Sequence, residues 1–275
     1  MRSLTSRQSQ AIGVFDSGVG GLTVMQHITK VLPKENIVYF GDTARVPYGG
    51  KSAEIITRYS IDNAIFLMSH NIKALVIACN TASSCALEKL QQIFNIPVIG
   101  TIYPAAEYAV KVTKMKKIAV LGTKATVNSG IFQKAIQLKI PDAEVISVPC
   151  PLFVPLVEEG LISHQACKLL VREYLSVLKD KNVDTVILGC THYPLLRSII
   201  AEELEPHIQI VDSAHTCAEA VNQLLQEHQL CNQQSTSGNY KYFVSDDPKR
   251  FREVGERFLG MPLDQVQIQS PDRHG

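Results

Sequence analysis

The chain has 275 residues, of which 45% are hydrophobic and 19% charged, and its formal net charge is +1. This length suits one large domain or two of ordinary size, and the composition is that of a globular protein rather than a disordered one. No run of lysine or arginine stands out, so nothing indicates a nucleic-acid or membrane-surface partner.

The amino-terminal residues 1–10, MRSLTSRQSQ, are polar and lack the apolar stretch of a secretion signal, so we expect a loose tail. No apolar run approaches the roughly 18 residues that a membrane helix needs. The chain holds seven cysteines without a tight framework of spacings. An odd count without a secretion signal predicts a reducing compartment, here the cytoplasm, and free thiols.

Short apolar runs alternate with helical patterns along the whole chain. The runs predict nine buried strands, at Ile12–Phe15, Ile37–Phe40, Ala74–Ala78, Val98–Gly100, Ile118–Leu121, Val145–Val148, Thr185–Leu188, Ile208–Val211 and Tyr240–Val244. Helical patterns lie between most of them, for example at Ser52–Ser69, Ala82–Phe94, Ser163–Leu178 and Thr216–Glu227. Repeated β-α alternation predicts the α/β class, with helices on both faces of parallel sheets. Because nine strands are many for one sheet, we expect two smaller, doubly wound sheets.

A glycine-rich turn follows the first predicted strand, in IGVFDSGVGGL at residues 12–22. Strand, glycine-rich turn and helix together can present backbone N–H donors to an anionic group. The dinucleotide-binding fingerprint is incomplete, because Thr23 stands where its third glycine belongs. Asp16 at the strand end would repel a phosphate and suits an ammonium group or proton transfer. A carboxylate that caps the following helix is an equally open interpretation.

The loop GDTARVPYGG at residues 41–50 follows the second predicted strand. The carboxyl ends of parallel strands share one edge of a sheet, so we expect this loop to lie beside Asp16. Pro47 and the Gly49–Gly50 pair shape a tight loop with exposed amides, and Tyr48 offers a hydroxyl. The same pattern also fits a plain surface turn.

Two segments of the chain resemble each other, KALVIACNTAS at residues 73–83 and DTVILGCTHYP at residues 184–194. Each is an aliphatic strand, a cysteine and polar residues where the next helix begins, which predicts two like-folded halves that face each other across a cleft. Cys79 and Cys190 therefore lie at strand ends where the helix dipole favours a reactive thiolate. The alternative is that each is a small buried hydrophobe. That second interpretation is the one we adopt for Cys85, Cys150, Cys167, Cys217 and Cys231.

His192 stands two residues after Cys190 and is the candidate to assist that thiol. A histidine beside a thiolate can lower the thiol pKa or carry a proton, whereas a lone histidine is usually structural. Cys79, Cys190 and His192 could also ligate a metal, but CxxC and HxxxH spacings and a fourth ligand are lacking, so no metal site is predicted. Glu158 and Glu159 follow a proline-containing stretch and are most simply helix-surface charges.

Four motifs, DSGVGG, GDTARVPYG, ACNTAS and GCTHYP, occur in this order at the ends of predicted strands. In sequence and spacing they closely resemble the bacterial glutamate racemases, over residues 12–211, a stretch that includes the PLVE and VDSA segments. No motif position departs from the family pattern. The resemblance implies interconversion of L- and D-glutamate without pyridoxal phosphate, another cofactor or a metal. In that family the reaction supplies D-glutamate for cell-wall peptidoglycan.

The resemblance also implies roles for individual residues. In the family, two cysteines on opposite faces of the substrate remove and return the α-proton. By motif match they are Cys79, which deprotonates D-glutamate, and Cys190, which deprotonates L-glutamate. Asp16 and His192 match the assisting polar residues, which also contact substrate, and Glu158 matches an acidic residue with a supporting role. Further positions match substrate-binding residues of the family: Ser17, Tyr48, Gly49, Asn80, Thr81, Thr123 and Thr191.

The chemistry agrees with these roles, because racemisation needs a base and an acid on opposite faces of the substrate. Two identical residues at corresponding strand ends can exchange those roles for the reverse reaction. Since a free thiol has a pKa of about 8.5, we expect only a modest shift to make it a base near neutral pH.

The family fold is two α/β domains around a buried cleft. It implies a first domain of residues 1–102 and 213–275 and a second of residues 103–212, related by a pseudo-twofold axis. The implied partner is a small molecule, L- or D-glutamate, and homodimers are common in the family. An aspartate racemase, which would share the paired cysteines, is the nearest rival interpretation. Some members inhibit DNA gyrase, but the near-neutral charge of this chain gives no support for direct DNA contact.

Overall fold

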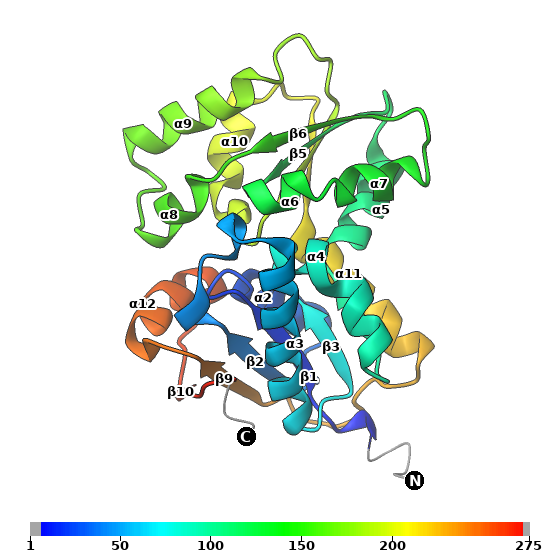
Figure 1. The fold of residues 1–275 in the computed structure, drawn as a ribbon, viewed down its shortest axis with the longest axis vertical. Helices are drawn as coiled ribbons and strands as arrows, with labels where there is room; N and C mark the ends of the chain where they lie inside the picture. Colours follow the sequence, from blue (N-terminus) through cyan, green and yellow to red (C-terminus); the bar gives the residue numbers. More distant parts are fainter. Residues whose placement is uncertain (1–6, 272–275) are drawn as a thin grey trace.

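The computed structural model describes residues 7–271 and contains two parallel β-sheets, one above the other in Figure 1. Six strands from both ends of the chain form the first sheet, in the order β10-β9-β2-β1-β3-β4. Their bounds are β1 Ile12–Asp16, β2 Ile37–Gly41, β3 Ala74–Ile77, β4 Val98–Gly100, β9 Tyr240–Val244 and β10 Val266–Ile268. The middle of the chain forms the second sheet, in the order β6-β5-β7-β8. Its strands are β5 Lys117–Gly122, β6 Glu144–Pro149, β7 Thr185–Gly189 and β8 Gln209–Asp212.

Helices connect the strands and cover both faces of each sheet. Those on the first sheet are α2 Leu22–Val31, α11 Ser213–Glu227 and α12 Pro248–Leu259 on one face, and α3 Ala53–Ser69 and α4 Asn80–Ile93 on the other. Those on the second sheet are α8 Phe153–Glu158, α9 Gln165–Ser176 and α10 Arg197–Glu203 on one face, and α5 Ile102–Val112 and α7 Ile131–Gln137 on the other. Shorter elements complete the loops: α6 Lys124–Asn128, η1 Thr43–Arg45, η2 Tyr48–Gly50 and η3 Tyr193–Leu196.

The central strand β1 shows why the first sheet carries helices on both faces. It pairs in parallel with β2 and β3, and all of its residues are buried. Ile12 and Val14 join the core beneath α2 and α11, whereas Phe15 joins the core beneath α3 and α4. A strand that is apolar on both sides is stable only when both faces of the sheet are covered.

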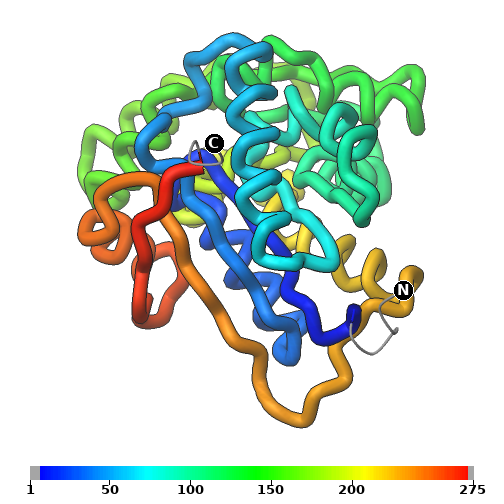
Figure 2. Tube along the Cα trace, turned by 60° about the horizontal axis from the view of Figure 1, so that its bottom comes forward, coloured from blue at the N-terminus to red at the C-terminus, as the bar shows by residue number. Residues whose placement is uncertain are grey.

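The two sheets share one continuous hydrophobic core. A single cluster of buried side chains includes Val14 and Ala78 from the first sheet and Leu121 and Leu188 from the second. The chain passes between the sheets at α5 and returns at α11, and these two helices pack against each other. Figure 2 shows the orange carboxy-terminal segment beside the blue strands, where β9 pairs in parallel with β2.

The prediction of an α/β fold with two parallel sheets is confirmed. All nine predicted strands form, and each boundary lies within one residue of the prediction. Strand β10 and helix α12 were not predicted. Helix α12 is strongly polar on its outer face, because Pro248–Leu259 reads PKRFREVGERFL, and only Phe251, Val254, Phe258 and Leu259 form an apolar stripe.

The amino-terminal prediction needs a correction for the residues that the structure describes. Residues 7–10 are not a loose tail, because Gln8 donates to the Gln229 carbonyl (3.0 Å) and its own carbonyl accepts from Lys73 Nζ (2.6 Å). Residues 1–6, and residues 272–275 at the other end, lie outside the described part of the chain. The domain limits at residues 102/103 and 212/213 stay a prediction.

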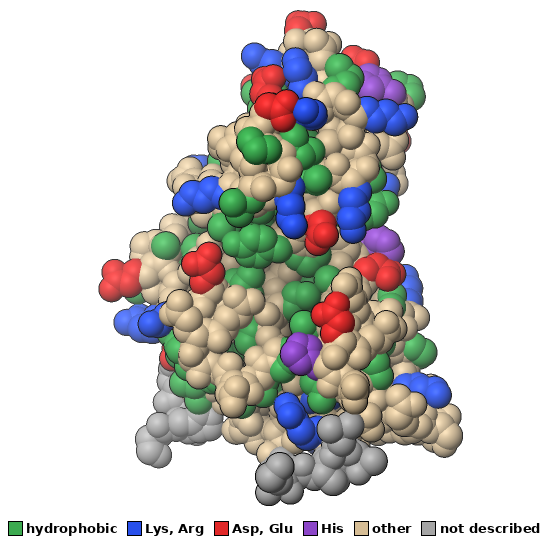
Figure 3. Space-filling view, turned by 90° about the vertical axis from the view of Figure 1, so that its right-hand side faces the viewer, with side chains coloured by type: hydrophobic (Ala, Val, Ile, Leu, Met, Phe, Trp, Pro, Cys, Tyr) green, Lys and Arg blue, Asp and Glu red, His purple; other side chains and the backbone are tan. Residues whose placement is uncertain are grey.

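The surface is mixed in charge. On the face shown in Figure 3, acidic and basic side chains are interspersed rather than gathered by sign. Within residues 7–271, no helix combines the length and the apolar character that crossing a membrane requires.

Candidate active site

Asp16 ends strand β1 and is completely buried. Its Oδ2 accepts a hydrogen bond from the Gly18 N–H (2.9 Å), while Oδ1 has no hydrogen-bond partner among the described residues. Burial raises the pKa of the Asp16 carboxyl, against the opposing effects of His192 and of the Gly18 and Gly21 amides. Helix α2 has Gly21 as its N-cap residue, and no side chain caps it. The capping interpretation of Asp16 is therefore wrong, and one carboxylate oxygen stays available for a ligand or a proton.

Cys79 follows β3 and is the N-cap residue of α4. Its thiol accepts from the Ala82 N–H (3.4 Å) and donates to Ser17 Oγ (3.6 Å). Cys79 is 6% exposed. Burial raises the pKa of the Cys79 thiol to about 12, and the charge of Asp16 adds to the rise, whereas the Ala82 amide lowers it. Cys79 therefore lies at a helix N-terminus, as the sequence predicts, but its thiol is buried away from solvent.

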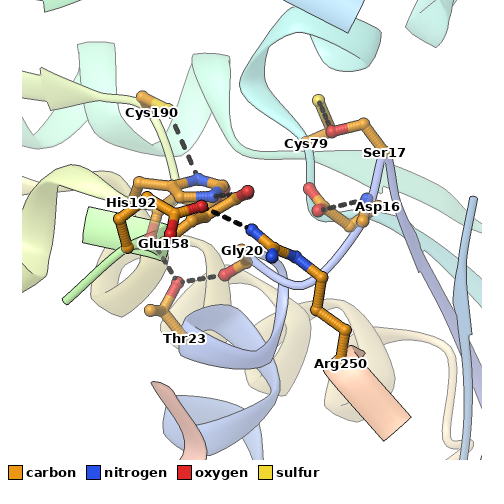
Figure 4. Close-up of polar contacts among 12 residues, drawn as sticks. Asp16, Ser17, Gly20, Thr23, Cys79, Glu158, Cys190, His192 and Arg250 are labelled. Carbon is orange, nitrogen blue, oxygen red and sulfur yellow. Dashed lines mark hydrogen bonds and ion pairs between the residues drawn. The ribbon is translucent and has the colours of Figure 1, made fainter. Parts of the chain in front are cut away.

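Cys190 follows β7 directly, in the corresponding place of the second sheet. Its Sγ lies 3.9 Å from His192 Nδ1, and Thr191 Oγ1 lies 3.4 Å from the same nitrogen. His192 Nε2 pairs with Glu158 Oε1 at 2.8 Å. Figure 4 shows this chain of side chains on one side of the site, and Cys79 with Ser17 and Asp16 on the other.

Glu158 is held as a carboxylate by this arrangement. Partial burial works against its charged form, but the hydrogen bond and charge of His192, with Arg250 beyond, hold the Glu158 pKa below its ordinary value. The helix-surface interpretation of Glu158 is wrong, because its side chain faces His192. Glu159 does lie at the surface, where it pairs with Arg250 (2.7 Å).

The loop after β2 is anchored by buried polar groups. Asp42 accepts hydrogen bonds from the Tyr48 hydroxyl and from Arg45 Nε (2.7 Å), and Asn63 Nδ2 donates to the Tyr48 oxygen (3.1 Å). The Tyr48 side chain is thus buried and its hydroxyl is engaged within the protein. Gly49 lies against Thr123, which follows strand β5 of the second sheet, since a Cβ at Gly49 would stand 2.9 Å from the Thr123 Cβ.

Hydroxyl and amide groups join the two halves beside the site. Thr81 Oγ1 lies 2.9 Å from Thr123 Oγ1 and 3.2 Å from Thr126 Oγ1. Asn80 Nδ2 donates to Ser213 Oγ (3.2 Å). These contacts place the first turn of α4 against residues that follow the strands of the second sheet.

A cavity of about 460 Å³ lies between the two sheets at these strand ends. The predicted site residues that line it are Ser17, Tyr48, Gly49, Thr81, Thr123, Glu158, Cys190, Thr191 and His192. Three others, Asp16, Cys79 and Asn80, are buried and not part of the lining. The hydrogen bond from Cys79 to Ser17 places that thiol directly behind the lining. The structure thus brings every predicted site residue to one place.

The family model of Asp/Glu/hydantoin racemases matches residues 12–221 of the chain. A glutamate racemase of Geobacter metallireducens is 52% identical over 257 residues, which cover 94% of this chain and 95% of that protein. The chain belongs to the Asp/Glu/hydantoin racemase family.

Solved structures resemble this racemase over almost its whole length. A glutamate racemase isoform of Bacillus anthracis has a TM-score of 0.93 and 39% identity, covering 96% of this chain and 98% of that chain. The glutamate racemase of Francisella tularensis, solved in complex with D-glutamate, has a TM-score of 0.91 and 40% identity, covering 97% of this chain and 100% of that chain.

The thiols of the racemase differ from the expectation of a modest pKa shift. Burial raises the pKa of Cys190 as well, with the Cys79, Asp16 and Glu158 charges adding to the rise and the His192 amide opposing it. Desolvation of a thiolate outweighs the helix dipole here, because both cysteines are buried. The raised pKa favours the neutral thiol at both cysteines, so a neighbouring group that takes the proton would help either one to act as a base.

Sequence reasoning missed several residues that shape the cavity of the racemase. Val46, Lys124, Pro151, Val154 and Pro155 also line it, together with Pro47 and Gly50 of the loop that the sequence analysis had described. Lys124 directly follows Thr123, so its place was available from the motif. Asp42, which holds the Tyr48 hydroxyl, and Gly20, which lies against His192, were also missed as site residues. The sequence analysis considered Gly20 only as part of a glycine-rich turn. No group of three or more His, Cys, Asp or Glu side chains among residues 7–271 is arranged to hold a metal ion.

Proposed function

We propose that this racemase interconverts L- and D-glutamate with Cys79 and Cys190 as the two bases. The observation that carries the proposal is the pair of buried thiols at corresponding strand ends of two sheets, with Cys190 in the lining of the cavity and Cys79 directly behind it at Ser17. Racemisation by two bases needs such a pair, because one group removes the α-proton while the other delivers a proton to the opposite face.

The neighbours of each thiol supply the means of ionising it. Because Glu158 accepts the proton on His192 Nε2, a neutral imidazole has its free lone pair on Nδ1, facing Cys190. His192 can therefore take the Cys190 proton when L-glutamate is the substrate. On the other side, the free oxygen of Asp16 can take a proton from Cys79 or hold the substrate ammonium when D-glutamate is bound.

The cavity suits a small dicarboxylate. Its lining offers the hydroxyls of Ser17, Thr81, Thr123 and Thr191 and the backbone of Tyr48–Gly49. We assign these groups, with Asn80, to binding the two carboxylates. Donors in an enclosed site also stabilise the negative charge that develops on the α-carboxylate when the α-proton leaves.

The wider role follows from the product. We propose that the D-glutamate supplies peptidoglycan synthesis in the cytoplasm. A reducing compartment is supported by the seven cysteines, all described and all free of disulfides. We also propose a homodimer, which size-exclusion chromatography with light scattering would test.

A direct assay tests the proposal. Purified protein, dialysed against a chelator and without pyridoxal phosphate, should convert L-glutamate to a racemic mixture, which circular dichroism follows. L-aspartate under the same conditions should react far more slowly. Loss of activity on chelation with recovery on added zinc would contradict the metal-free mechanism, and faster turnover of aspartate would contradict the substrate.

The solvent isotope experiment tests the two-thiol mechanism. Thiols exchange with water, so in deuterium oxide Cys79 carries deuterium before it protonates the intermediate formed from L-glutamate. Early D-glutamate should contain deuterium at Cα while recovered L-glutamate stays protiated, as measured by mass spectrometry after separation of the enantiomers. Substantial protium in the early product would contradict the two-thiol mechanism and favour a single base that serves both faces of the substrate.

A further inference from the structure

The imidazole of His192 is enclosed by groups from both halves of the molecule. From its own half come Glu158 at Nε2 and Cys190 near Nδ1. From the half built on the first sheet comes Gly20, whose backbone lies so close that a Cβ there would stand 2.5 Å from the imidazole Cε1 and Nδ1. A further neighbour is an aromatic ring from α12, the helix that the sequence did not predict.

Phe258 on α12 packs perpendicular to the His192 ring, with ring centroids 5.1 Å apart and an interplanar angle of 82°. Both side chains are buried, at 3% and 5% exposure. Edge-to-face aromatic pairs of this geometry are attractive and directional. A ring in this place therefore restricts rotation of the imidazole about the axis that brings Nδ1 toward or away from Cys190.

The residue before Phe258 contacts the partner of His192. Arg257 Nη2 donates to the Glu158 backbone carbonyl (2.8 Å). Gly160 leaves room for the guanidinium, because a Cβ there would stand 2.4 Å from Arg257 Nη1. About two turns earlier on the exposed side, Arg250 pairs with Glu159, the residue next to Glu158, and Figure 4 shows Arg250 on this side of the site. Successive residues of α12 thus touch both members of the His192–Glu158 pair.

We propose that Phe258 is a positioning residue for the proton transfer at Cys190, supported by Arg257. The ring holds the His192 imidazole so that Nδ1 faces the Cys190 thiol, and it does so only while the two halves of the molecule are closed on each other. Cys79 has no such dependence, because Ser17, Ala82 and Asp16, its contacts, all belong to the half built on the first sheet. The inference rests on the proposed two-thiol function and adds a residue outside the family motifs to it.

The test replaces the ring and follows each proton transfer separately. Phe258→Leu keeps an apolar side chain, and Phe243→Leu is the matched control. Phe243 is equally buried and also packs against a histidine, His70, at 4.7 Å between ring centroids, but outside the cavity. We expect kcat/KM to fall about tenfold in Phe258→Leu and to stay within about twofold of wild type in Phe243→Leu.

Isotope effects give the decisive reading. If the Cys190 step slows, the primary isotope effect on kcat/KM rises with [2-²H]-L-glutamate, which Cys190 deprotonates, and falls with [2-²H]-D-glutamate, which Cys79 deprotonates. A merely structural defect would move neither. Isotope effects that match the wild type, or that change equally for both enantiomers, would overturn the proposal. Absence of racemisation in the wild type would instead remove the proposed function itself.

A second variant keeps the test independent of core packing. Arg257→Gln alters an exposed side chain and should fold even if Phe258→Leu does not, as far-UV circular dichroism would reveal. We expect the same opposite-signed isotope effects at about threefold lower kcat/KM, in line with loss of one hydrogen bond. Arg252→Gln, at another exposed arginine of α12, is its control. Wild-type isotope effects in Arg257→Gln would contradict the supporting role of that arginine.

Discussion

Cys79 and Cys190 occupy corresponding places in the two sheets, yet their surroundings differ. Cys79 caps a long helix and has a lone carboxylate nearby, Asp16, with one oxygen unpartnered. Cys190 precedes a short 3₁₀ turn and faces a histidine that is itself paired with Glu158. The first arrangement lies within one half of the molecule, whereas the second draws Gly20 and Phe258 from the opposite half.

The difference lies in the assisting groups rather than in the thiols. In the proposed mechanism each cysteine alternates between base and acid, so the two sulfurs have the same task. A carboxylate and a histidine can both accept a proton from a thiol of raised pKa, and they leave different charges behind. Equal chemistry at the two sulfurs is thus compatible with unequal assistants.

Replacing either Cys79 or Cys190 should have the largest effect on activity. Cys79→Ala and Cys190→Ala should each lower kcat by at least about 10³-fold in both directions, because each direction needs an acid and a base. Cys85→Ala, at a half-buried cysteine of α4 outside the cavity, should retain activity. Polarimetry or circular dichroism with either enantiomer measures the loss. Full activity in either active-site variant would show that the sulfur is not a base.

Replacing Asp16 or His192 should distinguish the Cys79 side of the site from the Cys190 side. Asp16→Asn and His192→Asn should each lower turnover by about 10²- to 10³-fold. The loss in kcat should be unequal for the two enantiomers, and in opposite senses for the two variants. The loss in kcat/KM must be equal in both directions, because the equilibrium constant between enantiomers is one. Initial rates over a range of each enantiomer supply both quantities, and identical kcat ratios in the two variants would contradict separate assignments.

Gly20 tests the dependence of the Cys190 side on the opposite half. A methyl group there would stand 2.3 Å from Thr191 Oγ1 and 2.5 Å from the imidazole, so Gly20→Ala should displace His192 and lower kcat by about 10- to 10²-fold. A double-mutant cycle checks the route of the effect. If Gly20→Ala acts through the imidazole, it should add little in a His192→Asn background. An additive loss would place the effect elsewhere.

The smallest expected effect concerns stability rather than rate. The pKa of Asp16 is raised in the folded state by burial, so ionisation of this carboxyl destabilises the fold as pH rises above about 3.9, its unfolded value. Asp16→Asn should therefore raise the free energy of unfolding by about 1–3 kcal/mol at neutral pH. The gain should vanish below about pH 4, where Asp16 is protonated in both states. Urea unfolding at several pH values measures it, and a destabilised variant at neutral pH would contradict an unpartnered carboxylate.

Much of this fold was predictable from the sequence, for identifiable physical reasons. Buried parallel strands read as unbroken aliphatic runs, and such runs located β1 to β9 to within one residue. Helix starts were harder, because polar first turns carry no apolar periodicity. Helix α11 begins at Ser213, capped by Asp212, rather than at Thr216, and α4 begins at Asn80 rather than Ala82. Strand β10 is short and largely exposed, so it gives almost no apolar pattern.

Site residues that belong to a local sequence motif were predictable, whereas contacts between segments far apart in the sequence were not. Asp16, Cys79 and Cys190 follow from strand ends alone, and the family resemblance added Glu158. No local pattern links Phe258 to His192 or Asp42 to Tyr48, because these contacts depend on how the halves pack. The pKa of a thiol is equally non-local, since burial by residues far along the chain outweighs the adjacent helix dipole.

The order of strands along the chain has a consequence for biosynthesis. All strands of the second sheet lie between residues 117 and 212, whereas the first sheet takes β9 and β10 from residues 240–268. Domains tend to fold as their residues leave the ribosome. During translation all strands of the second sheet can therefore pair before β9, the neighbour of β2 in the first sheet, has been synthesised. Cys79 and Cys190 are then already synthesised, but Phe258 is not. A nascent chain would thus carry its two thiols before the ring that orders His192, and catalytic competence would come only with the final helix.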